Sequence, residues 1–547
     1  MSILDWLVMK RLRLPAGARH RVAIQRDLKV PMRDGMELVA DRYHPIGVHK
    51  APVVLLRSPY GKGVMVASTM ARPLAAQGFQ VLVQCCRGTG NSGGVFNPLR
   101  GEQSDGLDTI QWIKSQCWYA GSLGTYGGSY LGMTQWAIAE DAKSDVTAMA
   151  MTATLSGLHR MNYAGDSFML EIGLSWANMM ANRRVWSQWR LFLGLLLGIS
   201  LLSARQSRHL PLADLDTVVA GKRIPFWREW TEHANADDPY WADVDFHGAA
   251  LLSGPPISMV TGWYDLFAPW QLRDFAALQR SGRKARLTIG PWGHTDTELN
   301  RESLLDAFKW FRTLLLGDRP AATEKLVRLF VVGSNAWREF ESWPPAECVT
   351  VPWYLSGEFR LVDECLEASQ PDSFLYDPAN PTPSLGGAGM SRKRHTVDNR
   401  SLENRSDVVC YTSTSLDQDI EVIGVVEALL YVSTDAASAD FFVRLCDVDP
   451  KGVSWNVCDG LQKIQGEGAM SVQRVLVRLW PIAYRFKRGH RLRVQISGGA
   501  FPRWARNTGT AEPLTIATHL RSVNQTIHHN LEAPSAILLP VLPSASL

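Results

Sequence analysis

The segment GTYGGSYLGMTQW, residues 124–136, places Ser129 directly after two glycines and before a predicted helix. A serine on such a turn, at the carboxyl end of a strand, would project its hydroxyl from the edge of a sheet, and the turn requires small neighbours. The common pattern is G-x-S-x-G, but here leucine holds the second glycine position and Gly132 follows one residue later. The segment predicts a nucleophile elbow, and the alternative is a serine in an ordinary glycine-rich turn.

A serine hydroxyl is a weak nucleophile near neutral pH, so it needs a base, and the base needs an acid that orients it. Asp265 ends the apolar segment ISMVTGWYD, and His294 follows the predicted strand RLTIG in a Pro-Trp-Gly loop. Taken singly, the aspartate could cap a helix, and the histidine is one of thirteen. Together, in the order Ser, Asp, His and each after a strand, they predict a catalytic triad for acyl transfer.

The elements that would position these residues alternate between strand and helix over residues 30–150. Predicted strands are at 51–61, 80–94 and 121–128, with predicted helices at 67–79, 105–118 and from about 130. Such alternation predicts a parallel sheet with helices on its faces. From about 146 to 248 the chain becomes helical and rich in Trp, Met and Leu, and strands return at 255–265 and 284–294. We therefore expect the helical block to be an insertion into one α/β domain.

After about residue 348 the segments are short, β-branched and alternating, which is typical of an all-β sandwich or jelly roll. The fold class predicted is thus an α/β-hydrolase domain with an inserted helical cap and a C-terminal jelly-roll domain. The predicted segments are 1–145 (α/β, first part), 146–248 (helical cap), 249–347 (α/β, second part) and 348–547 (jelly roll).

Charge, cysteine spacing and the longest apolar run limit the partners, cofactors and membrane spans that we expect. The formal net charge of +4 over 547 residues is small and gives no reason to expect a nucleic-acid partner. The eight cysteines contain no CxxC spacing, so we expect no metal, no cofactor and free thiols in a reducing, cytoplasmic setting. The apolar run 191–203 has thirteen residues, too few for a membrane span of about 20. We interpret it as a buried helix, with an interface or a lipid-facing lid as alternatives; whether copies associate as a homo-oligomer stays open.

Several motifs occur together in one order: RSPYGK (57–62), RGTGNSGG (87–94), DGLDTIQWI (105–113), YGGSYLGMTQW (126–136), GWYDLF (262–267) and GPWGH (290–294). With them, the chain resembles the cocaine esterase and X-prolyl dipeptidyl-peptidase group of serine hydrolases over nearly its whole length. The displaced glycine after the serine lies where this group has it. Cys85 departs from the pattern, because the group usually has an acidic residue there, two before the arginine of the glycine-rich loop. We therefore expect an Asp–Arg support of this loop to be absent.

The resemblance implies the following roles. Ser129 would be the nucleophile, His294 the general base and acid, and Asp265 the group that orients the histidine. The oxyanion hole would consist of the backbone N–H of Tyr130 and the hydroxyl of Tyr60. A donor in such a hole is worth about a hundred- to thousandfold in rate.

The substrate is predicted from the pocket. The resemblance implies that Phe267 lines the acyl site, and the helical block adds aromatic residues, of which Trp176 and Trp186 are the predicted substrate contacts. Such a lining suits an uncharged ester or amide. Peptidases and α-amino-acid ester or β-lactam acylases of this group need carboxylates for the substrate ammonium, and Asp166 and Glu171 are the candidates. These activities are the alternative within the group; a catalytically inactive ligand-binding protein is the alternative from another class.

Overall fold

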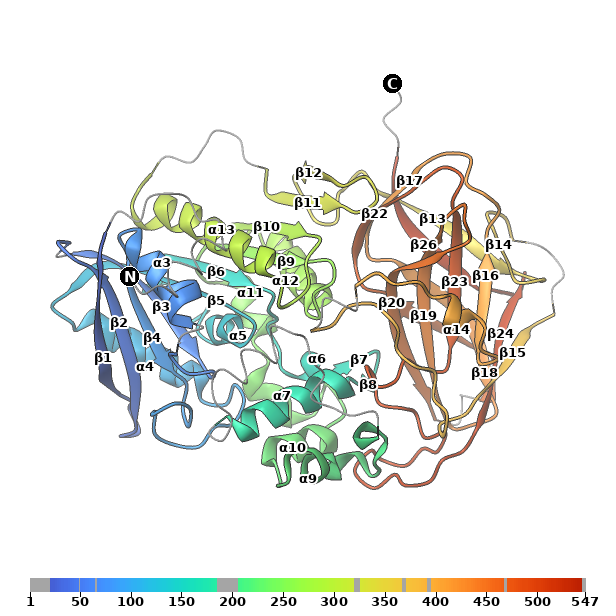
Figure 1. Cartoon of the computed structure of the whole chain (residues 1–547), viewed down its shortest axis with the longest axis horizontal. Coiled ribbons are helices and arrows are strands. Elements are labelled where there is room, and N and C mark those ends of the chain that lie inside the picture. Colours follow the sequence, from blue (N-terminus) through green and yellow to red (C-terminus); the bar gives the residue numbers. More distant parts are fainter. Residues whose placement is uncertain are drawn as a thin grey trace.

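The computed structural model describes residues 20–48, 50–63, 66–183, 205–318, 325–365, 370–390, 395–466 and 470–543. Two halves lie side by side in Figure 1: an α/β half that contains the N-terminal part of the chain and an all-β half that contains the C-terminal part. The helices α6 (His159–Asn162), α7 (Leu170–Asn182), α9 (Leu215–Ala220) and α10 (Pro225–Glu232) lie below the sheet of the α/β half in the same view.

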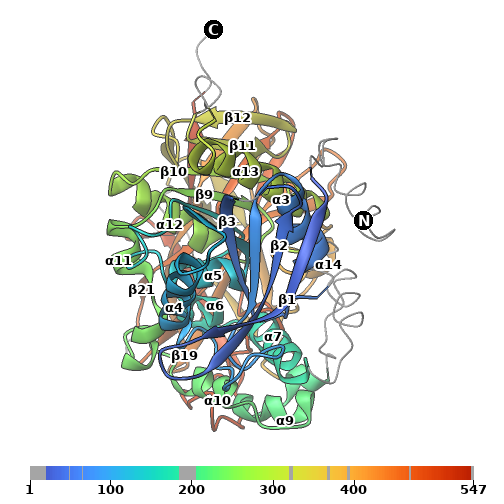
Figure 2. The same ribbon diagram turned by 90° about the vertical axis from the view of Figure 1, so that its left-hand side faces the viewer.

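The first half is built on a ten-stranded sheet of order β1-β2-β4-β3-β5-β6-β9-β10-β11-β12. Pairing is parallel from β4 to β11 and antiparallel at both edges, where β1 and β2 form one edge (Figure 2). The strands are β1 (Val22–Pro31), β2 (Glu37–Pro45), β3 (Ala51–Ser58), β4 (Gln80–Cys85), β5 (Tyr119–Gly128), β6 (Ala148–Thr152), β9 (Ile257–Gly262), β10 (Ala285–Gly290), β11 (Val327–Val331) and β12 (Ala336–Phe340).

Helices cover both faces of this sheet, because its central strands are apolar on both faces. In β3, Val53 and Leu55 belong to one hydrophobic cluster, and Val54 and Leu56 belong to another. The first cluster is completed by α4 (Glu102–Lys114) and α12 (Ala268–Arg280), and the second by α3 (Arg72–Ala76) and α13 (Thr297–Leu315). The alternation along β3 confirms a predicted strand that is buried on both sides.

A helical insertion separates β6 from β9. Its described elements are α6 (His159–Asn162), the hairpin β7 (Tyr163–Ala164) and β8 (Ser167–Phe168), α7 (Leu170–Asn182), η2 (Gln206–Arg208), η3 (Leu212–Asp214), α9 (Leu215–Ala220), α10 (Pro225–Glu232), η4 (Pro239–Val244) and α11 (His247–Leu252). The two ends of the insertion meet at an isolated bridge between Gly157 and Asp245. The predicted helical block began at 146, whereas residues Ala148–Thr152 form β6, a central strand of the sheet. The apolar run 191–203 lies outside the described residues.

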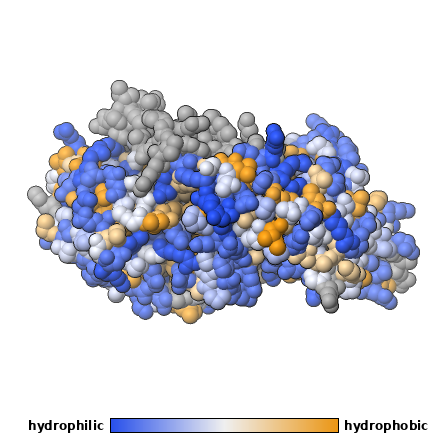
Figure 3. All heavy atoms as spheres, turned by 90° about the horizontal axis from the view of Figure 1, so that it is seen from below, coloured by the Kyte–Doolittle hydropathy of each residue, from blue (hydrophilic) through white to orange (hydrophobic). Residues whose placement is uncertain are grey.

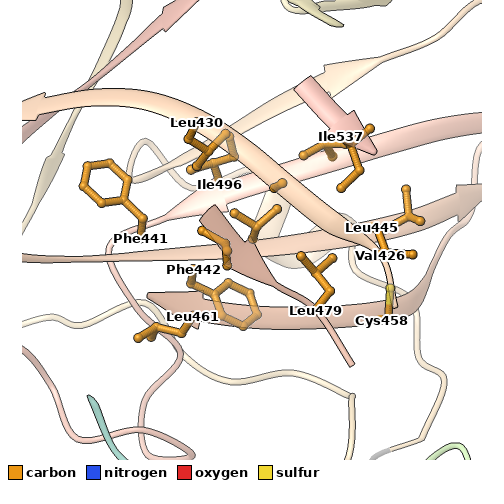
Figure 4. Packing of buried hydrophobic residues seen from close by; sticks show 14 of the residues in the cluster. Val426, Leu430, Phe441, Phe442, Leu445, Cys458, Leu461, Leu479, Ile496 and Ile537 are labelled. Carbon is orange, nitrogen blue, oxygen red and sulfur yellow. The ribbon is translucent and has the colours of Figure 1, made fainter. Parts of the chain in front are cut away.

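The C-terminal half is all-β apart from α14 (Arg400–Glu403), within the part of it that the structure describes. Phe441, Phe442, Leu461 and Leu479 lie in its core (Figure 4). Its strands are β13 (Val349–Ser356), β14 (Arg360–Val362), β15 (Asp372–Tyr376), β16 (Val408–Thr412), β17 (Ile420–Gly424), β18 (Glu427–Thr434), β19 (Ser438–Val448), β20 (Ser454–Gln465), β21 (Gln473–Arg478), β22 (Ile482–Phe486), β23 (Arg491–Ser497), β24 (Val523–Asn530), β25 (Ala533–Pro534) and β26 (Ala536–Leu542).

The surface seen from below is mainly hydrophilic, with small separate apolar patches (Figure 3). Among the described helices, none is long and apolar enough to cross a bilayer. All eight cysteines are free.

Candidate active site

Ser129 lies between β5 and α5 (Tyr130–Trp136), with φ 56° and ψ −127°. Positive φ is costly for a residue with a side chain and persists only where the surroundings enforce it. Here the backbone N–H of Ser129 donates to the carbonyl of Thr152, at the end of β6, over 2.9 Å. A Cβ at Gly132 would lie 2.5 Å from the side chain of Thr154, so only glycine fits one turn beyond the serine. Leu131, at the usual glycine position, is buried against the sheet.

Asp265 and His294 follow the adjacent parallel strands β9 and β10, so their loops leave the same edge of the sheet as Ser129. The Nδ1 atom of His294 lies 2.8 Å from Oδ2 of Asp265, and the aspartate side chain is fully buried. The backbone N–H of Phe267 donates to the other carboxylate oxygen over 2.7 Å. A carboxylate only accepts hydrogen bonds, so Nδ1 carries the proton and Nε2 keeps its lone pair. This is the tautomer that a general base requires.

Tyr60 follows β3, the neighbour of β5 in the sheet. Its hydroxyl accepts a hydrogen bond of 3.2 Å from the indole N–H of Trp176, on α7. The side chain of Ser129 also lies close enough to this hydroxyl to lower its pKa. Burial raises the pKa of Tyr60 above its ordinary value, although the contacts with Trp176 and Ser129 oppose the rise. The phenol therefore keeps its proton near neutral pH and remains a neutral donor beside the serine.

Tyr130 opens α5, where the first N–H groups of a helix have no acceptor within the helix. Its side chain is anchored below the site: the hydroxyl donates to Glu102 over 3.1 Å and accepts from the N–H of Leu99 over 2.8 Å. Glu102 in turn forms a buried ion pair of 2.6 Å with Arg57. This polar network holds the residue that follows Ser129. No sequence pattern indicated this network, because its members come from separate segments.

Of the three predicted pocket residues, the structure describes Phe267 and Trp176. The ring of Phe267 packs edge-on against the imidazole of His294, with centroids 5.2 Å apart. Trp176 stacks on Tyr130 with centroids 5.9 Å apart. Trp186 lies outside the described residues.

The two candidate carboxylates lie at different places in the insertion. Asp166 contacts the all-β half, and Glu171 lies on α7. Asp166 is exposed in the turn between β7 and β8, and its carboxylate accepts a hydrogen bond of 2.7 Å from Gln462 in β20. Glu171 is half-buried in the first turn of α7. The Asp166 carboxylate is therefore engaged by the all-β half.

The expectation that the glycine-rich loop lacks a carboxylate support is wrong. Arg87 pairs with Asp105 of α4 at 2.5 Å and with Asp34 of the β1–β2 hairpin at 2.7 Å. Cys85 is buried beneath the loop, close to Gly90. The arginine thus draws its partners from outside its own strand, which a position-by-position reading of the motif cannot detect.

The all-β half touches the loop that carries Asp265. The indole N–H of Trp480 donates to the backbone carbonyl of Asp265 over 3.3 Å. The guanidinium of Arg503 lies between the rings of Trp480 and Trp504, 4.5 and 4.4 Å from their centroids, and pairs with buried Asp459. Sequence reasoning missed this contact as well. Among the described residues, no group of three or more His, Cys, Asp or Glu side chains could hold a metal ion.

Comparison with known proteins gives consistent matches along the chain. Residues 34–296 match the family model of the X-Pro dipeptidyl-peptidase (S15 family), and residues 321–538 match that of the X-Pro dipeptidyl-peptidase C-terminal non-catalytic domain. The chain is 29% identical to the cocaine esterase of Rhodococcus sp. (strain MB1 Bresler) over 571 residues, which cover 95% of this chain and 99% of that one.

Two solved structures share the fold. An aminopeptidase from the marine sediment archaeon Thaumarchaeota archaeon superposes with a TM-score of 0.80 at 21% identity, covering 96% of this chain and 97% of that one. An alpha-amino acid ester hydrolase superposes with a TM-score of 0.80 at 20% identity, covering 96% and 98%. With its two family models in sequence and one relative matched over nearly its full length, the chain belongs to the cocaine esterase and X-Pro dipeptidyl-peptidase family of serine hydrolases.

Proposed function

We propose that this protein hydrolyses carboxylic esters or amides with Ser129 as nucleophile, His294 as general base and acid, and Asp265 as the group that orients the histidine. The observation that carries the proposal is the 2.8 Å hydrogen bond from His294 to a fully buried carboxylate, at the sheet edge where Ser129 adopts its strained backbone conformation. The alternative of a ligand-binding protein without catalysis gives no reason to keep this strain and this tautomer.

The reaction has two halves. The Oγ of Ser129 attacks the substrate carbonyl carbon while Nε2 of His294 takes the hydroxyl proton. The tetrahedral intermediate collapses, and the leaving alcohol or amine takes that proton from the imidazolium, which leaves an acyl-enzyme. Water then attacks the acyl carbon with the same proton transfers, and the acid leaves as Ser129 recovers its proton.

The negative charge of both tetrahedral intermediates needs donors. We assign them to the hydroxyl of Tyr60 and the backbone N–H of Tyr130. Both are neutral donors on anchored groups, so little reorganisation is required as charge develops. The Tyr130 anchor through Glu102 and Arg57 supports this assignment.

For the substrate we favour neutral aryl or medium-chain acyl groups. Phe267 and Trp176 supply apolar surface beside the triad and the oxyanion donors. The second candidate is an α-amino-acid ester or X-Pro dipeptide substrate, because structures of an aminopeptidase and of an alpha-amino acid ester hydrolase share this fold. Glu171, on the same helix as Trp176, is the carboxylate that such a substrate would require.

We also propose that the helical insertion acts as a cap over the site and that the all-β half is a jelly roll. The α/β segments would be those predicted, with the cap beginning after β6 instead of at residue 146. A cytoplasmic location stays a prediction.

Labelling with a fluorophosphonate tests the proposed chemistry, since it modifies only an activated serine. We expect one label, on the peptide that contains Ser129, and loss of labelling and of p-nitrophenyl ester hydrolysis in Ser129→Ala. The exposed Ser115→Ala is the matched control and should behave as the wild type. A Ser129→Ala protein that kept more than about a tenth of the activity would place the nucleophile elsewhere, because loss of a triad member leaves only the far smaller contribution of binding and the oxyanion hole.

A further inference from the structure

The hydroxyl of Tyr60 has one proton to donate and two lone pairs that accept. The indole N–H of Trp176 is a donor only, so in the 3.2 Å contact the tyrosine oxygen must be the acceptor. One lone pair of Tyr60 is therefore occupied from the side of α7. The proton of Tyr60 therefore points away from Trp176. Ser129 is the other side chain that acts on this hydroxyl.

Trp176 is itself held in place by aromatic packing. Its ring lies between Tyr130 and Trp230, with centroids 5.9 Å from each and interplanar angles of 15° and 23°. Phe96 and Phe226 pack against it at 6.1 and 6.0 Å. Turning the indole away from Tyr60 would break this packing, so the N–H donor has a fixed direction.

We propose that Trp176 is a positioning residue for Tyr60: by donating to the tyrosine oxygen it aims the Tyr60 proton at the oxyanion. The inference rests on the proposed function. It adds that Trp176 orients the Tyr60 hydroxyl, in addition to lining the acyl pocket. It also means that the helical insertion helps to assemble the oxyanion hole, because Trp176 belongs to α7 and Tyr60 to the loop after β3.

The two roles of Trp176 predict different kinetics. A pocket wall binds substrate and transition state alike, so its loss raises KM and leaves kcat nearly unchanged. A residue that directs an oxyanion donor acts mainly in the transition state, so its loss lowers kcat. The effect must also vanish when the tyrosine hydroxyl is absent.

Trp176→Phe keeps an aromatic ring and removes only the N–H donor. We expect kcat for p-nitrophenyl esters to fall about three- to tenfold, the range of one hydrogen bond, with KM changed less than about twofold. Trp310→Phe is the matched control: Trp310, on α13, is also buried and its indole N–H has no hydrogen-bond partner among the described residues, but it lies outside the aromatic stack around Trp176. Its kcat should stay within about twofold of the wild type. Trp176→Leu, which has no side-chain donor, is a second variant if Trp176→Phe folds poorly.

The decisive measurement is a double-mutant cycle with Tyr60→Phe, with each kcat divided by the fraction of molecules that a fluorophosphonate labels at Ser129. In the Tyr60→Phe background we expect Trp176→Phe to change kcat by less than about twofold, because its effect runs through the missing hydroxyl. An equal loss in both backgrounds, a loss in KM alone, or a Tyr60→Phe enzyme with unchanged kcat would overturn the inference and leave the triad standing. Failure to label Ser129 would instead overturn the proposed function.

Discussion

The indole nitrogen of Trp480, in the all-β half, lies 3.3 Å from the backbone carbonyl oxygen of Asp265, in the α/β half. The backbone N–H of Trp480 donates to the carbonyl of Asp459, and its ring packs on Arg503. Two hydrogen bonds thus hold the loop that carries Asp265. The N–H of Phe267, in the same loop, donates to the carboxylate, and Trp480 of the all-β half donates to the backbone carbonyl. The position of the carboxylate, and through it the orientation of His294, depends on both halves.

Trp480→Phe tests this dependence. We expect kcat/KM to fall about two- to tenfold, the range of one hydrogen bond, through looser placement of Asp265. Trp504→Phe is the matched control, because Trp504 packs on the other face of Arg503 and donates its N–H to Ala164, far along the chain from Asp265. The free energy of unfolding in urea should fall by a similar amount in both variants. Only Trp480→Phe should lose kcat/KM once activity is divided by the fraction of molecules that a fluorophosphonate labels at Ser129. Equal activity in the two would show that the contact only joins the halves.

Asp265→Asn should leave the fold intact and lower kcat by about 10⁴, since an amide in place of the carboxylate favours the wrong imidazole tautomer. The exposed Asp237→Asn serves as the control for the chemical change alone. Ester hydrolysis and the rate of Ser129 labelling measure the effect. A fall of less than about tenfold would mean that His294 is oriented by some other group.

Some strands of the first sheet could be predicted from the sequence, and one could not. The strands β3, β9 and β10 were predicted as short apolar runs bounded by turn residues, and β5 as a run of small, β-tolerant residues. The loops after β5, β9 and β10 carry Ser129, Asp265 and His294. β6 was missed because AMAMT has no β-branched residue before its last position, and so short a buried run reads equally as helix.

The supporting contacts were missed for a different reason. Trp176 and Tyr60 are 116 residues apart in the chain, and Trp480 and Asp265 are 215 apart. Nothing local to either partner marks such a contact, because only the folded topology brings them together. Arg87 shows the same limit: its partners Asp34 and Asp105 come from two other segments, so its support was wrongly expected to be absent.

Tyr60→Phe should lower kcat about a hundred- to thousandfold with little change in KM, as for loss of one oxyanion donor. Because burial raises the pKa of Tyr60 above its ordinary value near 10, the hydroxyl keeps its proton through the neutral and mildly alkaline range. The ratio of wild-type to Tyr60→Phe activity should therefore be constant from about pH 6 to 9. A ratio that declines within this range would show that the phenol ionises and is not the neutral donor assigned here.

Asp459→Asn should destabilise the all-β half by about 3–5 kcal/mol, because Arg444 and Arg503 would lose the buried carboxylate that neutralises them. Burial alone would raise the pKa of Asp459, but the two guanidinium groups outweigh it and hold the pKa below the ordinary value. The stabilisation is therefore complete above about pH 4 and is lost as the pH falls below it. The exposed pair Lys29–Glu37 is the control, and Glu37→Gln should cost less than about 1 kcal/mol in the same urea titration.

Substrate preference depends on a comparison of two free energies. Apolar acyl groups gain about 25 cal/mol for each Å² that Phe267 and Trp176 remove from water. A substrate ammonium at the same place would cost several kcal/mol unless a carboxylate met it. Asp166 is exposed and contacts Gln462 of the all-β half, whereas Glu171 lies on the same helix as Trp176, so Glu171 is the candidate of the two. We therefore expect neutral p-nitrophenyl esters to be hydrolysed well and X-Pro-p-nitroanilides poorly, after correction for their intrinsic reactivities.

Two variants make this comparison specific to the carboxylates. Asp166→Asn should leave both substrate classes unchanged, because its carboxylate is engaged by the all-β half. Glu171→Gln should leave ester hydrolysis unchanged and should remove whatever activity exists toward substrates with a free amino terminus. A higher corrected kcat/KM for the X-Pro-p-nitroanilide than for the neutral ester, abolished by Glu171→Gln, would reverse the preference and identify a peptidase, because only a carboxylate near the acyl site could offset the cost of desolvating the ammonium.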